Sequence, residues 1–440
     1  MNAAAHWMAL ARRSAGTPLC GGLAERMRDR HLTFGGRLLC PFLRPFFFSS
    51  ADEQRVIRAA TLLYVLGERV AAAAVGDRML MSELGLTEAE ASLAAIEPGY
   101  AVASTAARAD AFLLPESLRF AEYNAESPAG AGYTQRLSEL FDEEPLMAEF
   151  RQHFDTRYFT PIRLLLDALL ESYRDWGGTA RPPRLAIVDW REVPTWSEFE
   201  LMRDAFIALG IPTTIADPRD LEYDGTALRA GGERIDLVYR RVLINDIVAR
   251  PAECRALVEA YRTRAVCVAN TLRCKIPHKK AFFAVLTDDR FKSLFSAEER
   301  TAIRRHVPWT RVVRDGSIVE RLRENRETLV LKPNDEYGGA GVTLGWETST
   351  GAWDAAIDRA LTDRAGSWIA QERIEVRRET FPVCTDDGIV ERDMLVDFAP
   401  YLFRGKVAGY LTRLSSTGLA NVTSGGGQVP SFVVNDRSGE

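Results

Sequence analysis

The chain has 440 residues, a mass of 49.0 kDa and a formal net charge of −5, with 46% hydrophobic and 27% charged residues. This composition is that of an ordinary globular protein, and it excludes collagen, coiled coil and extended disorder. Because the chain is longer than one hydrophobic core usually serves, we expect two or three structural units.

The charge balance points away from polyanionic partners. With 56 basic and 61 acidic residues, no overall field draws the chain to nucleic acid or to anionic lipid, and no apolar run is long enough to span a membrane. The six cysteines are scattered and form no C-x-x-C pair, so we expect reduced thiols in a cytoplasmic protein. The five histidines show no zinc-binding spacing.

The predicted elements fall into three segments, 1–180, 181–270 and 271–440. In the first, apolar residues recur every three or four positions over 51–74 and 160–176 and predict helices, whereas 117–124 alternates like a strand. The second begins at a Pro-Pro break and alternates strands with helices, which predicts a small parallel sheet. The third is rich in strands. The predicted strands of the second and third segments are 185–189, 213–216, 235–239, 265–269, 329–332, 341–344, 368–371, 394–398 and 407–412.

A glycine-rich loop follows the strand predicted at 329–332. The sequence reads Lys332-Pro-Asn-Asp-Glu336-Tyr-Gly338-Gly339, and a second strand follows, so the segment is predicted to be a hairpin rather than a Walker A site. Backbone amides of such a loop close over phosphates, and Lys332 adds a positive charge. The alternative is a glycine-rich hairpin with a solvated lysine.

A second motif is Glu122-Tyr-Asn124. Residues i and i+2 of a strand share a face, so the Glu122 carboxylate and the Asn124 amide oxygen are predicted to point to one spot. Hard oxygen ligands of this kind suit Mg²⁺. The alternative is a polar strand edge that leads into a turn.

Two further segments complete a candidate nucleotide site. His278-Lys-Lys280 opens a predicted amphipathic helix, where a helix dipole disfavours cations, so the lysines suggest an anionic ligand. Gln371-Glu372-Arg-Ile374 ends a strand and enters a connector, whose backbone groups match the edge of an adenine. The alternatives are two solvated lysines and an ordinary charged turn.

In this order, the motifs resemble the circularly permuted ATP-grasp ligases, namely the eukaryotic-type glutathione synthetases and the ATP-grasp region of glutathionylspermidine synthetase. In most ATP-grasp enzymes the Glu-x-Asn motif comes near the end of the chain, and here it comes first. The match runs from Arg108-Ala-Asp110 to Arg413 and the glycines before Gln428. The resemblance implies an α/β fold in which 1–180 and 271–440 form the ATP-grasp unit, with 181–270 as an inserted, pre-ATP-grasp-like substrate domain.

The resemblance also implies roles for single residues. Magnesium ligands would be Glu122, Asn124 and Glu336. Lys280 and Lys332 would hold the phosphates of ATP, Arg108 and Ser127 would face the γ-phosphate, and Arg413 would meet a substrate carboxylate. The remaining nucleotide contacts would be Gly338, Gly339, Gln371, Glu372 and Ile374. The chain departs from the family at Asp335 and Tyr337, and at the lid, which reads Thr423-Ser-Gly-Gly-Gly-Gln428.

The function implied is an ATP- and Mg²⁺-dependent ligase that joins a carboxylate to an amine through an acylphosphate. The partners would be small molecules, an acid and an amine such as an amino acid, peptide or polyamine, with no nucleic acid and no membrane, and a homodimer is possible. Two alternatives stay open: a phosphotransferase of the same fold that stops at a phosphorylated product, and a non-catalytic ATP-grasp-like binding protein.

Overall fold

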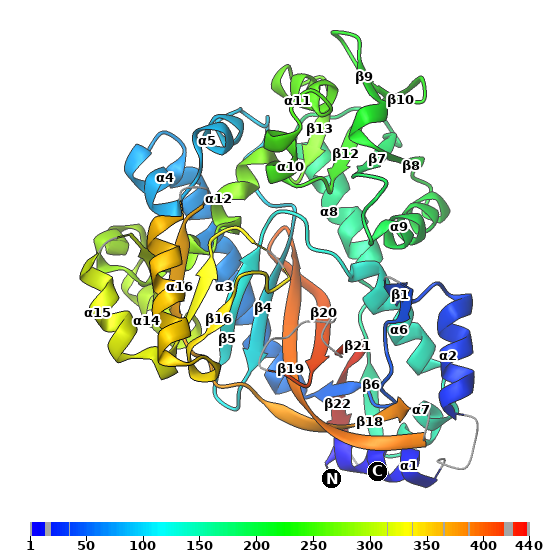
Figure 1. Cartoon of the computed structure of the whole chain (residues 1–440). Coiled ribbons are helices and arrows are strands. Elements are labelled where there is room, and N and C mark those ends of the chain that lie inside the picture. Colours follow the sequence, from blue (N-terminus) through cyan, green and yellow to red (C-terminus); the bar gives the residue numbers. More distant parts are fainter. Residues whose placement is uncertain are drawn as a thin grey trace.

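The structure is a computed structural model that describes residues 2–13, 19–34, 36–314, 316–336, 338–363, 366–385, 388–417 and 426–437. Three sheets position the candidate site (Figure 1). We call them the central sheet, the cap sheet and the parallel sheet. Both chain termini lie at the same end of the molecule, beside α1 (Ala3–Arg13).

The central sheet is antiparallel and has the strand order β21–β20–β19–β4–β5, with β18 paired to β19. Its strands are β4 (Ala106–Leu113), β5 (Leu118–Asn124), β18 (Arg378–Thr385), β19 (Gly388–Phe403), β20 (Lys406–Ser415) and β21 (Gly427–Val429). The pairing of Arg108 with Tyr401 joins β4 to β19 and therefore brings early and late parts of the chain into one sheet.

Helix α3 (Ser50–Ala74) packs against the central sheet and confirms the helix predicted at 51–74. Ser49 and Asp52 form a capping box that fixes its first turn, and Val56, Leu63 and Val70 on its inner face are buried. At Gly67 an added Cβ would lie 3.0 Å from the ring of Tyr123. The glycine therefore allows the helix to approach β5 closely.

The cap sheet has the order β14–β17–β15–β16 and is antiparallel. Its strands are β14 (Thr310–Val313), β15 (Leu329–Pro333), β16 (Thr343–Leu344) and β17 (Trp368–Glu372), and α15 (Gly316–Glu324) and α16 (Thr350–Thr362) lie beside it (Figure 1). Val330 pairs with Leu344, so β15 and β16 form the predicted hairpin around the glycine-rich loop. Trp353 and Leu331 are buried in the core beneath it.

The parallel sheet has the order β13–β12–β7–β8 and confirms the parallel sheet predicted between the two parts of the ATP-grasp unit. Its strands are β7 (Leu185–Val188), β8 (Thr213–Ala216), β12 (Leu237–Arg240) and β13 (Cys267–Ala269); the helices around it are α8 (Pro161–Asp175), α9 (Trp196–Ala208), α10 (Ile244–Ala249) and α11 (Arg255–Arg262). The buried Asn270 side chain donates to the carbonyls of Ala106 and Glu126, each at 2.7 Å. It thereby ties this sheet to β4 and to the segment after β5.

The remaining helices and strands belong to none of these three sheets. They are α2 (Leu19–Asp29), β1 (Thr33–Phe34), β2 (Arg37–Leu38), β3 (Phe46–Phe48), α4 (Arg78–Leu84), α5 (Glu88–Ala94), α6 (Ala131–Asp142), α7 (Pro145–Phe150), β6 (Phe154–Arg157), β9 (Leu221–Tyr223), β10 (Leu228–Ala230), β11 (Glu233–Ile235), α12 (Lys275–His278), α13 (Ala281–Thr287), α14 (Ala297–His306) and β22 (Ser431–Asp436). The expectation of an amphipathic helix after Lys280 is wrong, because α13 is buried on all sides from Ala281 to Leu286. In the described ranges no helix is both long and apolar enough to cross a membrane.

The cysteines differ from expectation at one pair. Cys20 on α2 and Cys384 on β18 form a disulfide across 364 residues of sequence, so the expectation of reduced thiols is wrong for these two. Cys40, Cys254, Cys267 and Cys274 are free and buried. The cytoplasmic location stays a prediction.

The disulfide closes a loop that spans most of the chain, so we expect it to stabilise the folded state by about 2–4 kcal/mol, chiefly by restricting the unfolded chain. The variant Cys20→Ser with Cys384→Ser should therefore melt at a lower temperature than the wild type in calorimetry. In excess dithiothreitol the two melting temperatures should coincide. A difference that persists in dithiothreitol would assign the effect to packing.

Candidate functional site

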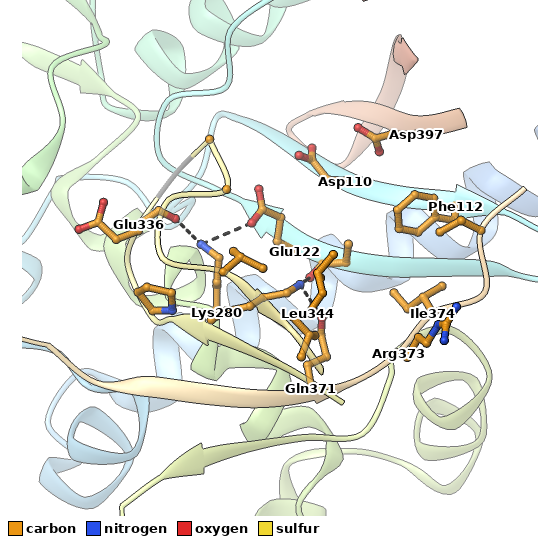
Figure 2. Close-up of a pocket in the computed structure, with 18 of the residues that line it drawn as sticks. Asp110, Phe112, Glu122, Lys280, Glu336, Leu344, Gln371, Arg373, Ile374 and Asp397 are labelled. Atoms are coloured by element: carbon orange, nitrogen blue, oxygen red, sulfur yellow. Dashed lines mark hydrogen bonds and ion pairs between the residues drawn. The ribbon is translucent and has the colours of Figure 1, made fainter. Parts of the chain in front are cut away.

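A cleft that is open to solvent lies between the central sheet and the cap sheet (Figure 2). Strands β4, β5, β19 and β20 supply one wall, and β15, β16, β17 and the loop between β15 and β16 supply the other. The cleft is lined by ten of the residues predicted from the sequence: Glu122, Lys280, Lys332, Glu336, Gly338, Gly339, Gln371, Glu372, Ile374 and Arg413.

Two carboxylates face each other on the wall formed by the central sheet. Asp110 on β4 and Glu122 on β5 are cross-strand partners, so their side chains lie on the same face of the sheet. Both line the cleft, as Figure 2 shows. Burial alone would raise the pKa of Glu122, but the positive charges of Lys280 and Lys332 outweigh it and hold the pKa below its usual value. Glu122 is therefore an ionised, partly buried oxygen donor.

Arg413 on β20 joins two acidic side chains at the inner end of the cleft. Its Nε donates to Asp397 at 2.6 Å and its Nη2 donates to Asp110 at 2.6 Å. Asp110 also accepts from Arg108 Nε at 2.7 Å, and the two arginines hold its pKa well below the usual range despite burial. Burial raises the pKa of Asp397 to about 6, although Arg413 opposes the shift. The two arginines and two aspartates form one buried chain of ion pairs.

Two lysines lie on the opposite side of Glu122. Lys280 Nζ is 3.4 Å from Glu122 Oε2 and donates to the backbone carbonyl of Glu336 at 2.5 Å. Lys332 Nζ donates to Gln371 Oε1 at 2.7 Å and to the Ala121 carbonyl at 3.3 Å. Burial lowers the pKa of Lys332 to about 8, with Glu122 opposing the shift. Lys332 therefore loses its charge within a pH range that is easily tested.

The side chain of Gln371 is held in one orientation by its neighbours. Its Nε2 donates to Thr310 Oγ1 at 3.2 Å, and the Thr310 hydroxyl in turn donates to the Pro308 carbonyl at 3.0 Å. Because the hydroxyl proton is used, Thr310 acts as the acceptor for Gln371. The amide oxygen of Gln371 is consequently the atom that faces Lys332.

The glycine-rich loop between β15 and β16 covers one mouth of the cleft. Gly338 and Gly339 have φ values of 65° and 79°, in the left-handed region that glycine adopts without a Cβ penalty. In Figure 2 the Glu336 carboxylate points away from Glu122, while its backbone oxygen faces Lys280. Of the predicted acidic side chains, Glu122 is thus directed into the cleft and Glu336 outward from it.

The end of β17 and the connector after it line the other end of the cleft. Glu372, Arg373 and Ile374 lie there beside apolar side chains of the two sheets. The Arg373 guanidinium stacks over the ring of Trp346 at 4.4 Å from its centroid. This end thus combines apolar side chains of both sheets with the charged side chains of Glu372 and Arg373.

Three predicted residues do not line the cleft. Arg108 pairs with Asp110 and donates to the Ala129 carbonyl at 3.0 Å, and the Ser127 hydroxyl donates to the Arg241 carbonyl at 2.8 Å. Asn124 Nδ2 donates to Glu122 Oε1 at 3.1 Å, so it contacts the site through its neighbour. Residues 423–425, half of the predicted lid at 423–428, lie outside the described residues.

Two acidic residues of the cleft, Asp110 and Asp397, were not predicted to have a role. For Asp110 a signal existed: it stands two residues after Arg108, so the two share a strand face. For Asp397 the sequence offers no comparable signal. It becomes part of the site only through its pairing with Arg413 across β19 and β20.

Comparison with known proteins identifies the family. The model of the family described as circularly permuted ATP-grasp type 2 matches residues 108–422, which is more than half of the chain. A protein of Frankia casuarinae named "Putative glutamate--cysteine ligase 2-2" is 24% identical over 328 residues, which make up 71% of this chain and 36% of that protein. An uncharacterised protein of Mycobacterium tuberculosis is 24% identical over 340 residues, covering 73% of this chain and 58% of that protein. The chain thus spans between about a third and three fifths of the length of these two relatives.

Among solved structures, the apo form of a glutathione synthetase-like effector from Globodera pallida superposes with a TM-score of 0.63. The alignment covers 94% of this chain and 96% of the effector at 13% sequence identity, so the likeness is one of fold. It agrees with the family match and with the predicted resemblance. The chain is a member of the circularly permuted ATP-grasp type 2 family.

Proposed function

We propose that this chain is an ATP- and Mg²⁺-dependent ligase that joins a carboxylate to an amine. The observation that carries the proposal is the charge distribution of the cleft. Glu122 and Asp110 lie on one wall, and Lys280, Lys332 and the glycine-rich loop lie opposite and beside them. A triphosphate requires cations and backbone amides, and a metal–triphosphate complex requires carboxylates as well. The end near Ile374, where apolar side chains of both sheets line the cleft, suits a purine.

The acidic side chains fit a magnesium ion. Mg²⁺ is usually bound by one or two protein carboxylates and completes its coordination with water and phosphate oxygens. Asp110 and Glu122 are two such carboxylates, and Asn124 orients Glu122. Among the described residues no group of three or more His, Cys, Asp or Glu side chains is placed to hold a metal ion. We therefore assign the remaining coordination positions to the triphosphate and water, with Glu336 as a further ligand if its side chain turns inward.

The chemistry assigned to the bound ion is neutralisation of the triphosphate, since carboxylates without it would repel the phosphates by several kcal/mol at low dielectric. Lys280 and Lys332 hold phosphate oxygens while the γ-phosphoryl group passes to an oxygen of the substrate carboxylate. The bond to the β-phosphate breaks and ADP leaves. An amine nitrogen then attacks the carbonyl carbon of the acylphosphate, loses a proton and releases phosphate, which leaves an amide. The loop and the cap sheet restrict water, which would otherwise hydrolyse the intermediate.

Arg413 is the residue that we assign to the acid substrate. It lines the cleft beside Glu122, and its guanidinium is already surrounded by Asp397 and Asp110. A substrate carboxylate would replace part of this contact. The name of the Frankia casuarinae relative, "Putative glutamate--cysteine ligase 2-2", is consistent with an amino-acid acid and an amino-acid amine.

The proposal is tested with [¹⁸O]-labelled L-glutamate as the acid and L-cysteine as the amine. A ligase should release ADP and phosphate in equal amounts only when both are present, and it should transfer one ¹⁸O atom from the acid to the phosphate. Steady ADP release without amine, with a phosphorylated product, would favour the phosphotransferase. Binding of MgATP without turnover over a panel of acids and amines would favour a non-catalytic protein.

Removal of one carboxylate should abolish most of the activity. We expect Glu122→Gln to lower amine-dependent phosphate release by about a hundredfold, because it removes a charged metal ligand while keeping the shape of the side chain. The control is Asp393→Asn, on the same sheet but exposed and paired with Arg378 outside the cleft. Retention of more than half of the wild-type rate in Glu122→Gln would remove Glu122 from the site.

The affinity for ATP should depend on the charge of Lys332. Its pKa of about 8 means that the ammonium form predominates below pH 8 and the neutral amine above it. MgATP binding, measured by calorimetry, should therefore weaken by up to about tenfold for each pH unit above 8. In Lys332→Arg, which stays charged throughout, the affinity should be flat from pH 7 to 9. The same decline in both proteins would assign the titration to another group.

A further inference from the structure

A buried group of charged residues lies behind the cleft. One of them, Lys275, does not line the cleft. The group comprises Lys275 and Lys279 around α12, Glu126 just after β5, Glu90 on α5 and Asp335 at the start of the glycine-rich loop. Lys275, Lys279, Glu90 and Glu126 each expose 4% or less of their surface. Charges buried this deeply are costly unless each is paired, and here each finds a partner of opposite sign.

Lys275 connects the two walls of the cleft. Its Nζ donates to Asp335 Oδ1 at 2.8 Å and to Glu126 Oε2 at 3.2 Å. Glu126 stands two residues after Asn124, at the end of the strand that carries Glu122. Asp335 stands one residue before Glu336, at the base of the glycine-rich loop. A single ammonium group therefore holds the end of β5 and the base of the loop together.

Lys279 makes different connections, whereas Lys280 joins the same two segments from inside the cleft. Lys279 Nζ donates to Asp335 Oδ2 at 2.6 Å and to Glu90 Oε1 at 2.9 Å, so it ties the loop to α5 and does not reach β5. Lys280 turns the opposite way, into the cleft, where it meets Glu122 and the Glu336 carbonyl (Figure 2). Lys279 thus resembles Lys275 in charge, burial and shared carboxylate, and differs in the segment that it anchors.

From these contacts we infer that Lys275 is a positioning residue that sets the width of the cleft at its triphosphate end. This inference rests on the proposed function. Lys275 touches neither nucleotide nor metal; it acts by holding the base of the loop against the strand that carries Glu122. The adenine end, near Ile374, is formed by other segments and does not depend on this contact.

The test compares Lys275→Met with Lys279→Met by calorimetry with MgATP and with AMP, which lacks the β- and γ-phosphates. In Lys275→Met we expect the Kd for MgATP to rise about tenfold and that for AMP to stay within about twofold of the wild type. In Lys279→Met the Kd for MgATP should change by less than about threefold. Hydrogen exchange should also be faster in residues 334–342 of Lys275→Met, with both variants checked for cooperative melting.

Equal weakening of MgATP binding by both substitutions, or no weakening by Lys275→Met, would overturn the inference while leaving the proposed function intact. Equal weakening of MgATP and AMP would also overturn it, because a general loss of packing acts on both ends of the cleft. If the wild type binds no MgATP, the proposed function fails together with the inference. Should Lys275→Met not fold, Asp335→Asn replaces it and is expected to give the same selective loss; wild-type affinity for MgATP in that variant would overturn the inference.

Discussion

Neutralisation of the charged side chains beside the cleft is the requirement that shapes the central sheet. Asp110, Asp397 and Arg108 are buried and Glu122 and Arg413 are partly buried, and such burial is tolerated only where each group meets an opposite charge. The antiparallel central sheet supplies this pairing directly, because cross-strand partners on one face lie close together. Asp397 meets Arg413 in register, whereas the cross-strand partner of Asp110 is a second carboxylate, Glu122, whose opposite charge comes from Lys280. The backbone ladder therefore determines the electrostatics of the site.

The order of segments along the chain explains why so many elements must meet. The strand with Glu122 lies in the first third of the chain, the parallel sheet follows, and the loop and β20 come last. The pairing of β4 with β19 closes this arrangement, and Asn270 and Lys275 join the segments from behind the cleft. The parallel sheet thus lies between the parts of the site in sequence, while the site itself is built on the two antiparallel sheets.

Much of the fold could be predicted from the sequence, because periodicity is a local property. The spacing of apolar residues predicted helix α3, and alternation predicted the strand with Glu122. The glycine-rich loop between two strands predicted the hairpin with Lys332. Strand β4 was not predicted as a strand, since it is rich in alanine, which has low strand propensity. The contribution of Asp110 depends on β4 and on its register with β5, and register is set by contacts between segments. For the same reason, the disulfide between Cys20 and Cys384 could not be predicted from the sequence.

The candidate site shows the same division. Residue types that are unusual where they stand, such as Lys280 before an apolar helix, were predicted and line the cleft. That Arg108 faces the γ-phosphate stays a prediction; in the structure its side chain contacts Asp110 and the Ala129 carbonyl. The sequence position of an arginine does not show which neighbours its guanidinium contacts. Lys275 is buried one helical turn before Lys279, but its position in the sequence does not distinguish it from a solvated lysine. Only the structure shows that it donates hydrogen bonds to two carboxylates.

The fixed amide of Gln371 has a consequence for how the cleft receives its ligand. Its oxygen accepts a hydrogen bond from Lys332 where an anionic oxygen of a ligand would otherwise do so, and it thereby holds the ammonium group in one position. A phosphate that binds then replaces the amide oxygen of Gln371 as the partner of the Lys332 ammonium group. Because this group is already held in position, little conformational freedom is lost at that step. The cleft is in this sense preorganised by a residue that carries no charge.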